Sequence, residues 1–188
     1  MSATGDSSIH LSPQADAPEG EEPPERLVAA IVEEDGDWSG FVLVEEAIQQ
    51  AAAALARHPR LRSARGGEVT VVLGSDTLVR RLNKTYRGKD TPTNVLSFPY
   101  QSPPGAAVDA GAYLGDVVLA AETISQEAAE RGIEPRHHLQ HLVVHGLLHL
   151  MGYDHDTDAA AEEMEGLETE VLATIGLADP YAVPAASR

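Results

Sequence analysis

The sequence contains no cysteine among its 188 residues, and this absence restricts its chemistry. Disulfide bonds and thiolate metal sites are both excluded, so a zinc or iron site would need histidine, aspartate or glutamate ligands. No apolar run is long enough to cross a bilayer, so no transmembrane helix is expected. The first 25 residues lack the basic start and apolar block of a secretory signal. We therefore expect a cytoplasmic protein without a membrane partner.

Positive charge is also scarce, since 13 Lys and Arg residues stand against 30 Asp and Glu residues and the formal net charge is −17. Taken alone, this excess of negative charge argues against a nucleic acid as partner. The distribution is uneven, however, because nine of the 13 basic residues lie within residues 57–89, opposed there only by Glu68 and Asp76. Such a segment is either a basic patch that binds a polyanion or an ordinary solvated surface, and composition leaves both open.

The length and the apolar content of 43% fit one globular domain with a core of its own. Residues 1–25 are rich in Pro, Ser, Asp and Glu, which predicts a disordered acidic tail. The domain is expected to span residues 26–180, with a short C-terminal tail over residues 181–188. Within the domain, residues 102–111 (SPPGAAVDAG) predict a flexible loop.

The apolar pattern predicts a single α+β domain with a small mixed four-stranded sheet and about five helices. Apolar and β-branched runs predict strands at residues 27–32, 68–73, 94–98 and 113–120. Helical spacing and capping residues predict helices at residues 42–57, 76–86, 122–131, 135–151 and 158–175, the second of them capped by Ser75.

The segment HGLLHLMGYDH, residues 145–155, holds three histidines in an otherwise apolar helix. On a helical wheel, residues 137–151 are apolar around most of the circumference, which is typical of a buried helix. The polar stripe that remains consists of His138, His141, His145 and His149. One buried histidine would be explained by a hydrogen bond to backbone or to a carboxylate. A stripe of histidines favours a metal site instead.

His145 and His149 are four residues apart, the spacing at which two rings on one helical face chelate a metal ion. His141 lies eight residues before His149, a rise of about 12 Å, which is too far for both to bind one ion. His155 follows Gly152, where the helix can end in a left-handed residue and turn back. We therefore predict one metal ion held by His145, His149 and His155. Three imidazoles with an open fourth position are typical of catalytic zinc.

The same histidine spacing occurs in the metzincin proteases, whose motif is H-E-x-x-H-x-x-G-x-x-H. There, a glutamate directly after the first histidine acts as general base, whereas this sequence has Gly146. Peptide hydrolysis would therefore lack its usual base. This favours a different substrate, or a base from elsewhere such as Asp154 or a metal-bound hydroxide.

Four segments together strongly resemble the YbeY family of bacterial endoribonucleases. They are HGLLHLMGYDH at 145–155, LNKTYRGKDTPTNVLSFPY at 82–100, LGDVV at 114–118 and EEMEGLETEVL at 162–172. The resemblance covers about residues 27–181 and keeps the family's order of motifs. It implies a zincin-like α+β fold and a zinc-dependent, single-strand-specific endoribonuclease with one Zn²⁺ in each chain. It also implies a role in ribosomal RNA maturation, especially 16S 3′-end processing, and in ribosome quality control, with the ribosome or its proteins as partners.

The resemblance also carries over to individual residues. The family's zinc histidines fall on His145, His149 and His155, and its functional arginine falls on Arg87. A guanidinium group suits this role, because it holds a phosphate by two parallel hydrogen bonds and can stabilise charge in the transition state. A zinc ion would polarise a phosphoryl oxygen or supply a hydroxide. Attack by the 2′-OH of the RNA itself is the alternative route, and the sequence does not separate the two.

Neighbouring side chains are candidates for further contacts with RNA. The basic candidates for the RNA backbone are Arg80, Arg81, Lys84 and Lys89, each of which is equally explained as a solvated helix charge. Stacking on bases is considered for Tyr86, Phe98 and Tyr100, although an aromatic residue near a strand is more often part of the core.

Asp116 precedes an apolar strand run and could orient a zinc-bound histidine or hold a turn. Two other classes of function stay open beside the endoribonuclease. One is a metalloprotease, and the other is a non-enzymatic ribosome-associated protein with a structural zinc ion and a basic docking patch.

Overall fold

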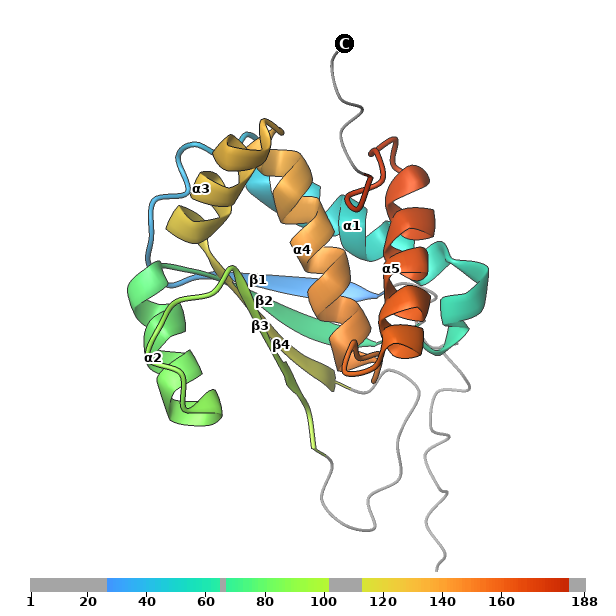
Figure 1. The fold of residues 1–188 in the computed structure, drawn as a ribbon, viewed down its shortest axis with the longest axis horizontal. Coiled ribbons are helices and arrows are strands. Elements are labelled where there is room, and N and C mark those ends of the chain that lie inside the picture. The colour runs from blue at the N-terminus through green and yellow to red at the C-terminus, as the bar shows by residue number, and fades with distance from the viewer. Residues whose placement is uncertain (1–26, 65–66, 102–112, 183–188) are drawn as a thin grey trace, which may run out of the picture.

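A four-stranded sheet lies at the centre of the structure, with helices on both of its faces (Figure 1). The computed structural model describes residues 27–64, 67–101 and 113–182. The strands are β1 (Val28–Glu33), β2 (Glu68–Gly74), β3 (Val95–Pro99) and β4 (Tyr113–Ala120). The helices are α1 (Val44–Arg57), the 3-10 helix η1 (Pro59–Ala64), α2 (Asp76–Arg87), α3 (Ala121–Arg131), α4 (Pro135–Leu150) and α5 (Asp158–Ala173).

The strands are ordered β1-β2-β4-β3 across the sheet. β1 pairs with β2 and β2 pairs with β4, both in parallel. β3 runs antiparallel to β4, with Leu96 opposite Val118 and Ser97 opposite Val117. The predicted α+β class with a mixed four-stranded sheet is confirmed.

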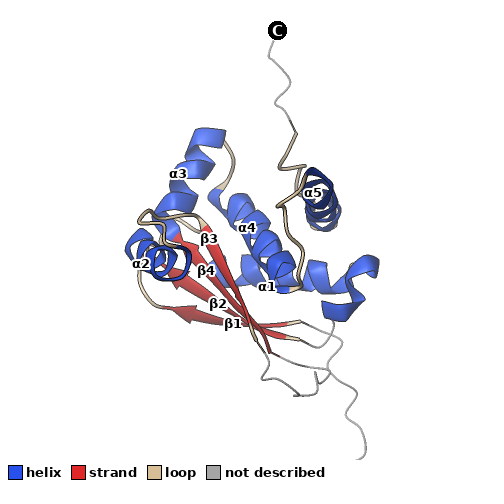
Figure 2. Cartoon of the chain, turned by 60° about the horizontal axis from the view of Figure 1, so that its bottom comes forward, coloured by secondary structure: helices blue, strands red, loops and turns tan. Residues whose placement is uncertain are grey.

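Alternation along the strands divides the core between the two faces of the sheet. Val117 and Leu119 of β4 belong to the main core, which they share with α1, α4 and α5. Val118 and Ala120 point the other way and pack with Val79 of α2 in a smaller cluster. Figure 2 shows this division, with α2 on one side of the sheet and α1 and α4 on the other. The two central strands, β2 and β4, are nearly continuous apolar runs because both of their faces are covered.

Helix α2 carries most of its polar side chains into solvent. Its start is fixed by Ser75, whose hydroxyl accepts a hydrogen bond from the Leu78 backbone N–H at 3.2 Å, as the sequence predicted. Its end is set by Gly88, which has a left-handed backbone with φ 70°. Only Val79 and Asn83 of this helix are buried, so the basic residues of α2 remain on the surface.

The predicted elements are all present, with boundaries displaced by one or two residues. α1 begins at Val44 rather than at Val42, because Leu43 adopts a left-handed conformation with φ 53° that cannot continue a helix. The short helix η1 was not predicted. The predicted tail over residues 1–25, the loop over 102–111 and residues 183–188 of the C-terminal tail lie outside the described residues.

Within the described part of the chain, no helix combines the length and the apolar character that spanning a bilayer requires.

Candidate active site

The orientation of the histidine stripe on helix α4 is set by the packing of the helix's other faces against the core. Leu139, Val143 and Leu147 are fully buried in the main core. Gly146 faces the sheet so closely that an added Cβ would lie 2.8 Å from Val117 Cγ1. On the same side, the Ser97 hydroxyl of β3 donates a hydrogen bond to the Gly146 carbonyl at 3.0 Å. These contacts fix both the depth and the rotation of α4 on the sheet.

The C-terminal end of α4 reverses the chain and brings His155 back toward the helix. Gly152 is left-handed with φ 89°, and its N–H donates to the His149 carbonyl at 3.0 Å. The Tyr153 N–H donates to the Leu148 carbonyl at 3.1 Å, which completes a Schellman motif. The predicted reversal at Gly152 is therefore confirmed, and the His155 ring lies with its centroid 5.0 Å from that of His149.

In both His145 and His149, the Nδ1 atom is hydrogen-bonded to an oxygen acceptor and the Nε2 atom faces the other ring. His145 Nδ1 donates to Glu168 Oε1 at 2.8 Å, and His149 Nδ1 donates to the Tyr153 carbonyl at 3.0 Å. When both rings are neutral, both Nε2 atoms therefore present lone pairs, and they lie 3.1 Å apart. Two lone pairs at this distance repel each other unless a cation lies between them.

This donor set fits a metal ion. The ligand atoms of His145, His149 and His155 all lie within 4.8 Å of one another. Nitrogen ligands of a tetrahedral zinc ion, each about 2.0–2.1 Å from the metal, are separated by about 3.3 Å. Burial lowers the pKa of His149, and the neighbouring His145 lowers it further, which favours the neutral imidazole that binds metal. His155 is exposed, so the site opens to solvent on its side.

Glu168 of α5 is the carboxylate beside the histidines, and sequence reasoning missed it. Its side chain is fully buried, and it accepts hydrogen bonds from His145 and from His141 Nε2, the latter at 2.7 Å. Burial alone would raise its pKa, but the hydrogen bonds from His141 and His145 outweigh burial and lower the pKa to about 2. The signal available in the sequence was a glutamate on the otherwise apolar face of α5.

The suggestion that Asp116 orients a zinc-bound histidine is wrong. Asp116 alternates with Val117 in β4 and therefore lies on the face of the sheet opposite α4. Its carboxylate accepts a hydrogen bond from the Tyr113 hydroxyl at 2.5 Å. It does not hold a turn either, since it lies within the strand.

Arg87 is the last residue of α2, and its side chain is exposed. Two of the four other basic candidates are occupied by Asp90, whose carboxylate accepts from Arg80 Nε and from Lys84 Nζ, each at 2.8 Å. These two hydrogen bonds lower the pKa of Asp90 to about 2. Arg81, Arg87 and Lys89 make no ion pair among the residues that the structure describes.

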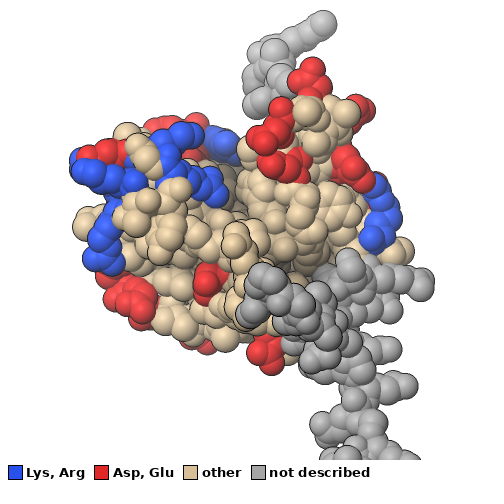
Figure 3. Space-filling view, turned by 90° about the horizontal axis from the view of Figure 1, so that it is seen from below, with Lys and Arg blue, Asp and Glu red and all other residues tan. Residues whose placement is uncertain are grey.

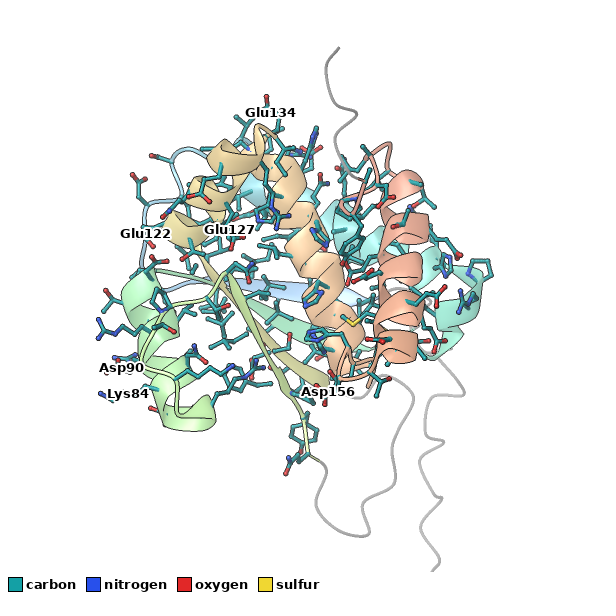
Figure 4. All side chains as sticks on the ribbon, in the orientation of Figure 1. Lys84, Asp90, Glu122, Glu127, Glu134 and Asp156 are labelled. Carbon is teal, nitrogen blue, oxygen red and sulfur yellow. The ribbon has the colours of Figure 1, made fainter. Side chains whose placement is uncertain are left out.

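Helices α2 and α4 both end toward the same side of the molecule (Figure 1). Figure 4 shows Lys84 and Asp90 at α2, and Asp156 next to the C-terminal end of α4. Seen from that side, the Lys and Arg side chains of α2 lie across a hollow from the acidic side chains of α5 (Figure 3). A polyanion in this region would be attracted toward α2 and repelled from α5.

The three aromatic candidates separate into core and surface. Phe98 is half-buried and packs with the cluster under α2. The side chains of Tyr86 and Tyr100 are 68% and 53% exposed, so both remain available for stacking. Tyr86 lies against Phe98 in an edge-on contact, with ring centroids 5.2 Å apart.

The family model of Endoribonuclease YbeY matches residues 40–176, which contain the three histidines, Arg87 and Glu168. The chain belongs to the endoribonuclease YbeY family. The family predicted from the sequence motifs is thereby confirmed, and with it the prediction that this protein is an enzyme.

Curated relatives support this membership over most of the chain. Endoribonuclease YbeY of Azorhizobium caulinodans is 48% identical over 159 residues, which cover 84% of this chain and 98% of that protein. Endoribonuclease YbeY of Parvibaculum lavamentivorans is 48% identical over 161 residues, covering 82% of this chain and 85% of the relative. The solution structure of TM1509 from Thermotoga maritima has a TM-score of 0.50 at 24% identity and covers 83% of this chain and all of that one, which supports the fold.

Proposed function

We propose that this protein is a zinc-dependent endoribonuclease that cleaves single-stranded RNA. The observation that carries the proposal is the group of three imidazoles, two of which point free Nε2 atoms at each other across 3.1 Å, in a chain of the endoribonuclease YbeY family. The proposed biological role is maturation of ribosomal RNA, including processing of the 16S 3′ end, and ribosome quality control. The proposal includes a cytoplasmic location and contacts with the ribosome or its proteins.

In the proposed mechanism, His145, His149 and His155 hold the zinc ion, and Arg87 binds the scissile phosphate. A zinc ion held there would supply a Lewis acid that polarises a phosphoryl oxygen. The Arg87 guanidinium donates two parallel hydrogen bonds to phosphoryl oxygens and neutralises the charge that develops in the transition state. Arg81 and Lys89 are free to contact the flanking RNA backbone, while Arg80 and Lys84 already share Asp90.

The identity of the group that attacks the phosphate defines two routes, water and the RNA 2′-OH. Asp154 was considered as a general base for water, and its side chain is exposed with one oxygen accepting from the His155 N–H at 2.7 Å. Hydrogen bonding by the His155 backbone lowers the pKa of Asp154, which makes it a weaker base. Asp154 is therefore a weak candidate for the base that activates water, and the proposal includes both routes. A deoxyribose at the cleavage position distinguishes the two routes.

A metalloprotease is disfavoured by the packing of Gly146. The position that holds the general base in metzincins faces Val117 and Ser97, and a Cβ there would come within 2.8 Å of a Val117 methyl group. A glutamate at this position has no room to reach the histidines. The alternative of a purely structural zinc ion is disfavoured by His155, which is exposed and leaves one side of the site open.

The proposal is tested by cleavage of a labelled single-stranded RNA with wild type, Arg87→Ala and His149→Ala proteins. Arg57→Ala is the matched control, because Arg57 is likewise an exposed arginine at the C-terminal end of a helix. We expect wild type and Arg57→Ala to cleave, and both site variants to lose about 100-fold or more in rate. Zinc should be lost only from His149→Ala. Equal cleavage by all four proteins would reject the proposal.

A further inference from the structure

Glu168 stands out because its carboxylate is buried with a full set of donors around it. Its side chain has 0% exposure, and an isolated charge at such a depth is strongly unfavourable. Three donors compensate for burial. His145 Nδ1 binds Oε1 at 2.8 Å, His141 Nε2 binds Oε2 at 2.7 Å, and the Tyr181 hydroxyl also donates to Oε2. Each oxygen of the carboxylate is therefore held in place by at least one hydrogen-bond donor.

The hydrogen bond at Glu168 Oε1 determines which nitrogen of His145 carries the proton. Because a carboxylate oxygen only accepts, His145 must place its N–H at Nδ1. In the neutral imidazole, which is the form that binds metal, Nε2 then carries the lone pair and lies 3.1 Å from His149 Nε2. His149 needs no carboxylate for the same purpose, since the Tyr153 carbonyl already fixes its Nδ1–H. Of the two helical ligands, only His145 relies on a side chain from another helix.

The position of Oε2 is held in part by a hydrogen bond from the segment that follows α5. Tyr181 donates its hydroxyl to Glu168, and its backbone N–H donates to Asp179 Oδ1 at 2.9 Å. Asp179 also accepts from the Thr169 hydroxyl at 3.2 Å, which ties the segment back to α5. His141 contributes the other donor to Oε2, so its Nε2–H is directed at Glu168 and offers no lone pair to a metal ion.

We infer that Glu168 is a positioning residue that sets the tautomer and orientation of His145 for metal binding, and that Tyr181 holds Glu168 in place. The inference rests on the proposed metal site. It extends the functional residues beyond the histidine segment to α5 and to the chain that follows it. In this arrangement His141 is not a metal ligand, and it holds the second oxygen of Glu168 by a hydrogen bond.

The first test measures zinc affinity by competition with a chromophoric chelator. Glu168→Gln keeps the size of the side chain but replaces one acceptor by an N–H₂ donor, so it cannot accept from both His145 and His141. We expect a loss of 10–100-fold in zinc affinity, the usual effect of removing a partner that orients a metal ligand. Tyr181→Phe removes only one hydroxyl and should give a smaller loss in the same direction. Glu162→Gln, an exposed change on α5, is the control and should bind zinc as wild type does.

The second test reads the tautomer of His145 directly in metal-free protein, from ¹⁵N shifts of its imidazole. Wild type should carry the proton on Nδ1, and Glu168→Gln should show a mixture of tautomers. Zinc affinity within twofold of wild type in both Glu168→Gln and Tyr181→Phe, with the tautomer unchanged, would overturn the inference. Failure of wild type to cleave RNA, with the expected losses in affinity intact, would reject the proposed function and leave the role of Glu168 standing.

Discussion

Among single residues, Asp90 has a large effect on the charge of the proposed RNA-binding surface. One carboxylate accepts from both Arg80 and Lys84, and all three side chains are exposed. Exposed ion pairs add little to stability, because water screens them. These ion pairs affect RNA binding instead, because a phosphate must compete with Asp90 for Arg80 and Lys84.

The first residue-scale prediction concerns the pKa of Asp90. We expect a ¹³C titration of its carboxyl group to give a pKa of about 2, against an ordinary value of 3.8, because Arg80 and Lys84 both donate to it. A group with a lowered folded-state pKa stabilises the fold above its ordinary value and loses that contribution as the pH falls through about 2. In Arg80→Ala/Lys84→Ala the pKa should return toward 3.8. A wild-type value near 3.8 would contradict these hydrogen bonds.

At this scale, the sequence predicted what helix geometry determines and missed what tertiary packing determines. The four-residue spacing placed His145 and His149 on one face, and Gly152 indicated the reversal that brings in His155. Glu168 is 23 residues from His145 along the chain, and only the docking of α5 against α4 brings their side chains together. Asp116 was considered as a partner of a zinc-bound histidine or as a turn residue, and neither holds, because tertiary packing decides which face of the sheet lies toward α4.

Among the elements, α4 is the one whose placement determines the site. It approaches the sheet closely at Gly146, where Val117 Cγ1 and Ser97 Oγ would lie 2.8 and 3.1 Å from an added Cβ. Glycine in a helix normally reduces stability relative to alanine. Its presence here is explained by close packing, which overrides helix propensity.

The element-scale prediction compares two glycines in helices. Gly146→Ala should lower the free energy of unfolding by about 1–2 kcal/mol, because overpacking of a core costs more than the gain in helix propensity. Gly166→Ala in α5 is the matched control, since no atom lies within 4 Å of its added Cβ. It should raise stability by about 0.5–1 kcal/mol. Urea denaturation measures both, and equal effects of the two substitutions would contradict the close packing of α4.

The elements themselves were largely predictable, because each carries its own pattern and end signals. Ser75 and Gly88 bound α2, and the strand over residues 113–120 was predicted with its observed ends. The strand order β1-β2-β4-β3 was not predicted. It depends on which strands pair across long stretches of chain, and local periodicity contains no information about that pairing.

For the whole molecule, the proposed metal site lies at the edge of the core, where His145 and His149 are half-buried and His155 is exposed. The main cluster of buried apolar residues joins the sheet to α1, α4 and α5. Burial of this apolar surface is what stabilises the fold. A ligand that binds only the folded state adds stability by mass action, in proportion to the logarithm of its concentration. Zinc should therefore stabilise the folded chain without being required for folding.

The most direct test of the account is stepwise return of zinc to chelator-treated protein, with the rate of single-stranded RNA cleavage measured against the zinc bound. We predict that metal-free protein keeps its far-UV circular dichroism spectrum and does not cleave. The cleavage rate should then rise in proportion to bound zinc and level off at one ion in each chain. Cleavage at full rate by folded protein without metal would contradict the account.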